Sequence, residues 1–318
     1  MLAGIAGLGA GTAAAHGAFQ ARPDWTTAFT AWEFDPLFIV PLVAVAWAYG
    51  AAVRKVNREH PASPFPAMRV GYFAAGLAAL VLALMSPIAA YDTTLFSVHM
   101  IQHMLVTAVA APLLLLGAPV TLALRAASPQ VRKEVLLPIL HSRLVRAGSF
   151  PVVAWRLFTG VMWISHYSPL FDAALENAWL HRLEHALYLG SALLFWWPAV
   201  GLDLSPWRLN HPLRLLNVFL QMPQQAFLGT AIYNAGTVIF PHYASLERDW
   251  GPSPLGDQQY AGIIMWVVGD VLFLIALACI AYGWVKYEER SAKRGDAARA
   301  RDRARAAAAA AASDTHGG

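Results

Sequence analysis

Charged residues are scarce in this chain, and cysteine is almost absent. Asp, Glu, Lys and Arg make up 13% of the 318 residues, whereas hydrophobic residues make up 58%. Soluble domains carry about 25% charged residues, so an ordinary soluble domain is excluded. The net charge of only +4, with its basic residues in a few loops and the tail, gives no reason to expect a nucleic-acid partner. The single cysteine, Cys279, excludes an internal disulfide and a CxxC thiolate site.

Long apolar runs fill the chain instead. Seven of them reach the length of about 17–25 residues that a helix needs to cross a bilayer. They cover residues 36–53, 70–90, 95–117, 151–167, 179–199, 213–240 and 260–285. Twelve tryptophans and ten tyrosines suit the interfacial belts of such a protein. We therefore expect an all-α, polytopic bundle of seven transmembrane helices surrounded by membrane lipid.

The distribution of Lys and Arg between loops predicts the orientation of this bundle. The loops after the first, third and fifth expected helices, and the tail, are rich in Lys and Arg. Loops 91–94 and 168–178 contain neither residue, and loop 241–259 contains only Arg248. Positively charged loops stay in the cytoplasm, so we expect an outside N-terminus and a cytoplasmic C-terminus in a bacterial plasma (inner) membrane.

The two ends of the chain differ from its apolar middle. Residues 1–30 form an expected extracytoplasmic segment, in which the small, apolar stretch 1–21 resembles a signal peptide without the usual charged n-region. Residues 31–287 form the expected seven-helix membrane domain. Residues 288–318 are rich in Ala and Arg and predict a disordered or frayed cytoplasmic tail without a core of its own.

Five histidines are expected at the outer ends of these helices. His99 and His103 are four residues apart, as are His181 and His185, and His166 ends the fourth expected helix. A spacing of four puts both imidazoles on one helix face, about 6 Å apart, where they can share a metal ion. Polar groups inside a membrane are costly and favour a functional role. The five histidines therefore predict a metal site, with satisfied hydrogen-bonding histidines as the alternative.

The neighbours of these histidines favour copper. Met100 and Met104 are interleaved with the first pair, and imidazole combined with thioether is typical of Cu(I) sites. Ordinary packing is the alternative for both methionines. Glu184 and Asp257 are candidate acceptors that fix an imidazole tautomer, although Glu184 can instead pair with Arg182. His242, in an outer loop, is a further candidate ligand.

One acidic residue is expected deep inside the membrane. Asp270 lies about ten residues into the last apolar run, which is near mid-bilayer at 1.5 Å per residue. A protonated Asp270 hydrogen-bonded to Gln224 or Gln225 is the structural interpretation. A path for protons or ions is the functional one.

Four stretches of the chain, taken in order and spacing, resemble a known family. They are FSVHMIQHMLVTAVAAPLLLLGAP (96–119), WISHYSPLFDAAL (163–175), HRLEHALYLGSALLFWWP (181–198) and YASLERDWGPSPLGDQQYAGIIMW (243–266). Together they resemble the multi-pass CtaG family of cytochrome c oxidase assembly factors associated with caa-type oxidases, over roughly residues 30–287. The resemblance implies a seven-helix plasma-membrane protein needed to assemble an active haem–copper oxidase. Copper supply is the usual interpretation of this role.

The resemblance also assigns residues to the family's motifs. Its histidines correspond to the five named above, and its DQ motif to Asp257 and Gln258. Asp270 stands where a small or apolar residue is expected. The Ala/Arg-rich tail is likewise unlike the family pattern.

The sequence thus supports a non-enzymatic assembly factor that binds Cu(I) at the outer membrane face and supports assembly of a copper centre. Its expected partners are cytochrome c oxidase subunits and a periplasmic copper donor. A copper transporter is the first alternative, but it needs polar or thioether groups across the whole bilayer. A di-iron or haem redox enzyme is the second alternative. A metal-free assembly scaffold is the third.

Overall fold

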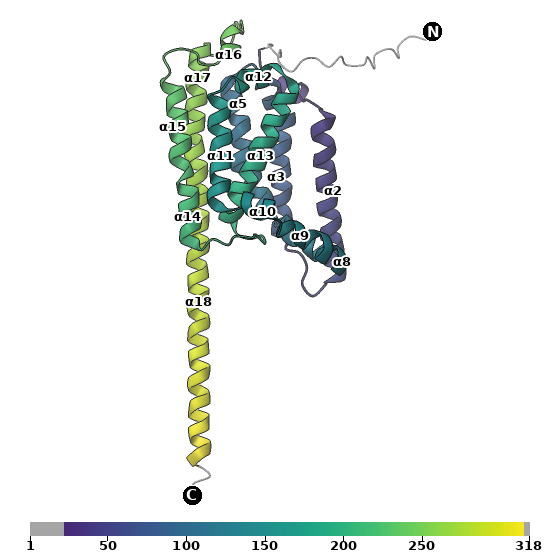
Figure 1. Cartoon of the computed structure of the whole chain (residues 1–318), viewed down its shortest axis with the longest axis vertical. Helices are drawn as coiled ribbons and strands as arrows, with labels where there is room; N and C mark the ends of the chain where they lie inside the picture. Colours follow the sequence, from purple (N-terminus) through teal and green to yellow (C-terminus); the bar gives the residue numbers. More distant parts are fainter. Residues whose placement is uncertain (1–21, 315–318) are drawn as a thin grey trace, which may run out of the picture.

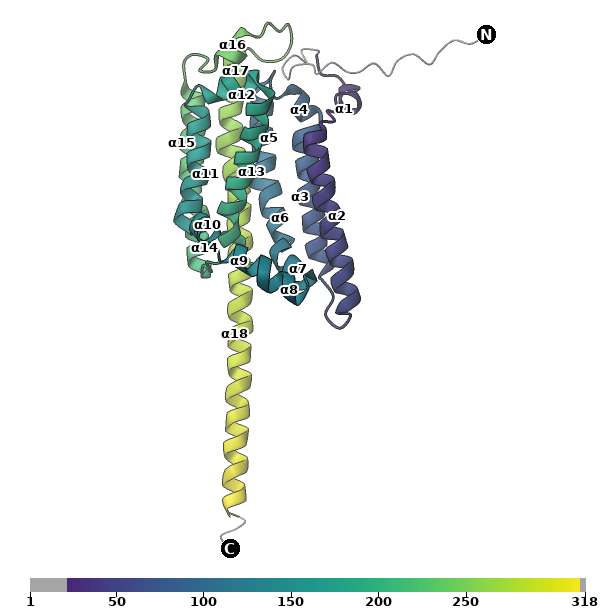
Figure 2. The same cartoon turned by 45° about the vertical axis from the view of Figure 1, so that its right-hand side comes forward.

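The computed structural model describes residues 22–314, in which the chain folds into helices without any strand. The signal-like stretch 1–21 lies outside the described residues. Long helices stand side by side in Figures 1 and 2, and shorter helices close the bundle at both ends. The all-α prediction is confirmed.

Each of the seven predicted apolar segments is helical. The segments are α2 (Pro36–Glu59), α3 (Ala67–Met85), α5 (Phe96–Met104) continued by the π-helical η1 (Leu105–Ala110) and by α6 (Ala111–Leu116), α11 (Pro151–His166), α13 (Ala178–Val200), α14 (His211–Phe219) followed by α15 (Gln221–Asn234), and α17 (Pro254–Ile263) continued by η3 (Ile264–Val268) and α18 (Gly269–Asp314).

Short helices lie at the two ends of the bundle. The end drawn upper in Figures 1 and 2 carries α1 (Thr27–Thr30), α4 (Pro87–Tyr91), α12 (Leu170–Glu176) and α16 (Pro241–Ser245). The lower end carries α7 (Pro119–Ala126), α8 (Pro129–Val131), η2 (Arg132–Leu136), α9 (Leu137–Leu140) and α10 (Arg143–Gly148).

Four helical stretches are long and apolar enough to cross a membrane: Pro36–Glu59, Ala67–Tyr91, Phe96–Ala126 and Pro254–Arg303. The chain is therefore a membrane protein by helix length and composition. The expected sixth span, 213–240, is divided between α14 and α15, and it ends at Asn234. Pro223 has no N–H to donate to the carbonyl four residues earlier, which accounts for a break at Leu220.

The last helix continues far beyond the bundle. α18 runs without interruption to Asp314, and its lower half extends below the other helices in Figure 1. Residues 288–314 of the predicted tail are therefore helical in the structure, and the side chains between 296 and 303 are exposed. Ala and Arg have high intrinsic helix propensity, which explains a helix that has no core to pack against.

Two glycines bring α15 and α17 into close contact. A Cβ atom on Gly262 would lie 2.7 Å from the carbonyl oxygen of Gly229, and one on Gly229 would lie 2.8 Å from the carbonyl oxygen of Gly262. Small residues let the backbones of membrane helices approach closely, and dispersion then stabilises the pair. This contact fixes α17, which in turn supports the upper end of the bundle.

We expect Gly262→Ala to destabilise the protein by about 1–3 kcal/mol, because the added methyl group meets backbone atoms that cannot move aside cheaply. The measurement is the thermal midpoint of the detergent-solubilised protein, followed by intrinsic tryptophan fluorescence. Gly190→Ala is the matched control, since a Cβ there meets nothing within 4 Å. Equal midpoints for both variants would contradict the close contact.

Candidate metal centre

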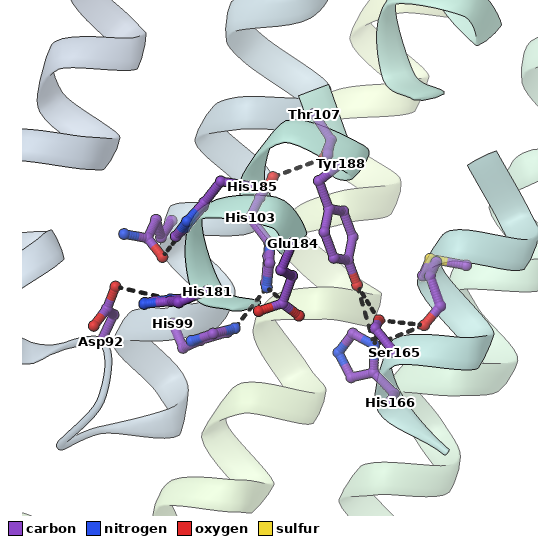
Figure 3. A network of polar contacts seen from close by, with 12 residues as sticks. Asp92, His99, His103, Thr107, Ser165, His166, His181, Glu184, His185 and Tyr188 are labelled. Atoms are coloured by element: carbon purple, nitrogen blue, oxygen red, sulfur yellow. Dashed lines mark hydrogen bonds and ion pairs between the residues drawn. The ribbon is translucent and has the colours of Figure 1, made fainter. Parts of the chain in front are cut away.

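The two predicted histidine pairs meet at the upper end of the bundle. His99 and His103 extend from α5, and His181 and His185 from the first turns of α13 (Figure 3). Ring centroids are 4.3 Å apart within the first pair and 4.5 Å within the second. Across the helices, His99 and His181 lie 5.8 Å apart, and His103 and His185 lie 6.1 Å apart.

His166 joins the same cluster from the end of α11. Its ring centroid lies 6.3 Å from that of His103. All five histidines are at least 95% buried. The third, fourth and fifth predicted helices therefore do converge at one end, and their histidines form one buried cluster, called here the histidine cluster.

Asp257 positions the helix that carries the first pair. Its carboxylate, on α17, accepts hydrogen bonds from the backbone N–H of Phe96 (2.7 Å) and from the hydroxyl of Ser97 (2.5 Å). A carboxylate at this place satisfies N–H groups that have no partner within the helix and complements the helix dipole. Asp257 thus caps α5, and its hydrogen bonds among the described residues go to Phe96 and Ser97.

The neighbouring Gln258 ties other segments together. Its Oε1 accepts from the backbone N–H of Ile239 at 2.8 Å, and its Nε2 donates to the carbonyls of Ile232 (3.3 Å) and Thr237 (3.1 Å). The DQ pair therefore fixes α5 and the end of α15 from one turn of α17.

Three of the five imidazoles, those of His99, His103 and His166, are hydrogen-bonded through one ring nitrogen only. The Nε2 atoms of His99 and His103 are 2.6 Å apart, so one ring donates to the other. In His166, Nδ1 lies 2.7 Å from the carbonyl oxygen of Met162 and donates to it. The other ring nitrogens, Nδ1 of His99 and His103 and Nε2 of His166, have no hydrogen-bond partner among the described residues.

Two buried carboxyl groups stand beside the cluster. Oε1 of Glu184 is 3.9 Å from Nε2 of His103, and neither oxygen of Glu184 has a hydrogen-bond partner in the described part of the chain. Oδ2 of Asp92 is 3.6 Å from Nε2 of His181. Burial raises the pKa of Asp92 well above its usual range. Ionising a carboxyl group at such a depth is costly unless a cation lies beside it.

The sequence analysis did not identify Asp92. It lies in the short loop between α4 and α5, seven residues before His99. Residues 92–95 are not helical, so the helical spacing that pairs the histidines gave no signal for Asp92.

Three further polar residues hold the imidazoles in place. Gln102 accepts a hydrogen bond from Nε2 of His185 at 2.8 Å and donates to the carbonyl of Ala83 at 3.0 Å. The Tyr188 hydroxyl lies 2.6 Å from that of Ser165 and 3.3 Å from Nδ1 of His166. Each of these three residues lies within one helical turn of a histidine in the sequence. That closeness was the signal by which the sequence could have indicated them.

The two methionines have other neighbours. Met100 packs in an apolar cluster with Phe96 and Met162. The sulfur of Met104 accepts a hydrogen bond from Nε2 of Gln225 at 3.6 Å. The structure therefore supports the packing interpretation for both thioethers.

His242 and Asp270 also lie in settings of their own. His242, on α16, donates from Nε2 to the carbonyl of Thr93 at 2.8 Å, and its backbone N–H donates to Asp172 at 3.0 Å. These bonds tie α16 to its neighbours and support a structural role for His242. Gln225 donates to the carbonyl of Met265 at 2.8 Å, and Oδ1 of Asp270 has no hydrogen-bond partner among the described residues. The predicted bond from Gln224 or Gln225 to this oxygen is therefore not present.

Comparison with known proteins identifies the family. A family profile described as cytochrome c oxidase caa3 assembly factor (Caa3_CtaG) matches residues 47–287. Uncharacterized proteins of Mycobacterium bovis and Mycobacterium tuberculosis are each 33% identical over 281 residues, and one of Mycobacterium leprae is 32% identical over 282 residues. These alignments cover 86% of this chain but 42% of each relative, so the chain spans less than half the length of these curated relatives. No solved structure matches the chain.

The profile spans the histidine cluster, the DQ pair and the helices that support them. The resemblance noted in the sequence is confirmed, and the chain belongs to the family of cytochrome c oxidase caa3 assembly factors.

Proposed function

We propose that this chain is an assembly factor of a bacterial plasma membrane that binds Cu(I) in the histidine cluster and supports assembly of a copper centre in its client oxidase. Family membership supports the assembly role. The observation that carries the copper role is the meeting of five buried histidines from three helices at one end of the bundle. Imidazole is a common copper ligand.

The hydrogen bonding of the cluster fits a bound cation. A buried ring nitrogen that lacks a partner is destabilising, by about 1–3 kcal/mol for a typical buried polar group. Three such nitrogens, on His99, His103 and His166, lie in this cluster. The ring of His99 or His103 that donates through Nε2 has a free lone pair on Nδ1, and His166 has one on Nε2. A metal ion that accepts these lone pairs offsets this cost.

Copper is cargo in this proposal and not a catalytic cofactor. Exchange of one imidazole for another moves the ion without a change of oxidation state, so no enzymatic activity is required. The partners are then oxidase subunits and a copper donor on the same side of the membrane. The cluster lies at one end of the bundle, which favours delivery on that side over transport across the bilayer.

We further propose that all seven helical segments cross the membrane, with the upper end outside. The lower-end helices between α8 and α10 carry several basic residues, whereas loop 241–259 at the upper end carries only Arg248. This asymmetry supports a cytoplasmic lower end and C-terminus.

A metal-free scaffold is the second candidate, and one observation favours it. His99 and His103 bond to each other, and Gln102 bonds to His185, so part of the cluster is satisfied without metal. In that case the client oxidase depends on protein contacts alone.

The first test is an anaerobic Cu(I) competition titration of the purified protein with a chromophoric chelator. We expect the wild type to compete for Cu(I) and a His99→Ala/His103→Ala/His181→Ala/His185→Ala variant to have lost tight binding. His60→Ala/His141→Ala is the matched control, because both side chains are exposed at the lower end, away from the histidine cluster. Absence of Cu(I) binding by the wild type would refute the copper role.

The second test is complementation in a bacterium that lacks its own family member but contains the client oxidase. We expect the wild type to restore oxidase activity and oxidase-bound copper, and the four-histidine variant to restore neither at equal membrane abundance. Full restoration by that variant would instead establish the metal-free scaffold.

The orientation is tested by cysteine labelling in a Cys279→Ser background. In spheroplasts, we expect a membrane-impermeant maleimide to label Glu176→Cys at the upper end at once. Lys133→Cys, at the lower end, should react only after permeabilisation. Both side chains are exposed, so the opposite result would reverse the proposed orientation.

A further inference from the structure

The histidine cluster contains two groups of ligands, and each group has its own carboxylate. Asp92, His181 and His185 form one group, called here the outer group. His99, His103 and Glu184 form the inner group. In each group, the three residues offer ligand atoms that all lie within 4.8 Å of one another. Figure 3 shows Asp92 and Glu184 on different sides of the stacked imidazoles.

A small cavity adjoins the outer group. Its volume is about 20 Å³, and Asp92, His181 and His185 contribute to its lining. A cavity needs about 10–15 Å³ to hold one water molecule, so this one has room for a single small species. Glu33, Asp35 and Arg182 also line it, and Arg182 forms an ion pair with Asp35 at 2.8 Å. The outer group therefore adjoins a polar cavity, whereas the cavity of about 410 Å³ beside Glu184 of the inner group is lined mainly by apolar side chains.

The charge of each group matches a monovalent cation. The neutral imidazoles contribute no charge, and each group contains one carboxylate. One Cu(I) ion per group then gives a site with no net charge, whereas a divalent ion leaves each site with a positive charge. Uncompensated charge is costly inside a membrane protein, so the charge balance of each group favours a monovalent ion such as Cu(I) over a divalent one.

The two groups are close enough for direct exchange. The rings of His99 and His181, one from each group, are nearly parallel at an interplanar angle of 11°, with centroids 5.8 Å apart. An ion that leaves the outer group therefore meets a ligand of the inner group after a movement of a few ångströms. The ion then moves from one group to the other without crossing an apolar region.

We propose that the histidine cluster binds two Cu(I) ions, one in each group, and that the outer site loads the inner site. This inference rests on the proposed copper role and adds the number of ions and their order of entry. Asp92 and Glu184 are then ligands of different ions, although both border one continuous cluster.

The test is the number of Cu(I) ions bound per chain, measured by anaerobic competition with a chromophoric chelator and by metal analysis. We expect two ions in the wild type, one in Asp92→Asn, one in Glu184→Gln and none in the double variant. Asp172→Asn is the matched control and should bind two, since Asp172 is an upper-end carboxylate that bonds to the backbone of His242. Gel filtration and circular dichroism check that each variant is folded. His181→Gln replaces Asp92→Asn if the latter does not fold, with the same expected result.

The order of entry is tested by stopped-flow loading from the chelator. We expect Asp92→Asn to fill its remaining site at least about 10-fold more slowly than Glu184→Gln fills its own, as for loss of a group that supports a metal site. Equal rates would overturn the loading order. A single ion in the wild type, weakened alike by both substitutions, would overturn the two-site proposal while leaving the copper role intact. Absence of any ion in the wild type would refute the copper role itself.

Discussion

The bond between Asp257 and the start of α5 is the interaction on which the geometry of the histidine cluster depends. Two residues of the inner group, His99 and His103, lie within two turns of that helix end. Asp257 can hold α5 because α17 is itself fixed by its close glycine contact with α15. The packing of α15 against α17 therefore fixes Asp257, and Asp257 fixes the end of α5 that carries the two imidazoles. A flexible loop at the same place would not define ligand distances.

Burial then determines what the cluster can bind. Five imidazoles and two carboxyl groups are buried, and in such a place unpaired charge is destabilising. Neutral imidazoles also hydrogen-bond to each other, to Gln102 and to a backbone carbonyl, which partly offsets the cost of their unpartnered nitrogens when no ion is bound. The carboxyl groups provide the charge that a cation requires. The same cluster is thus compatible with an empty and a loaded state, as a carrier of transient cargo needs.

The sequence alone predicted the helical segments and the one-sided grouping of the five histidines, because apolar length and the four-residue spacing are local properties. It did not predict Asp92, whose loop position has meaning only after α4 and α5 are placed against α13. It assigned Met100 and Met104 to copper because they adjoin the histidines in the sequence. On a helix, however, adjacent residues point about 100° apart, and both thioethers contact other partners. The contact of Asp257 with the start of α5 was not predicted for a related reason: the partner of a helix end can come from a distant helix.

The absence of methionine from the polar groups bears on how copper would be released. Thioethers bind Cu(I) without competition from protons, whereas imidazole nitrogens and carboxylates exchange the metal for protons. A site made only of these groups therefore loses affinity as its ligands are protonated or offered other hydrogen bonds. Gln102 already accepts such a bond from His185. Ligands with an alternative partner nearby can release an ion at low cost. The proposed delivery role requires that property, whereas a permanent structural metal does not.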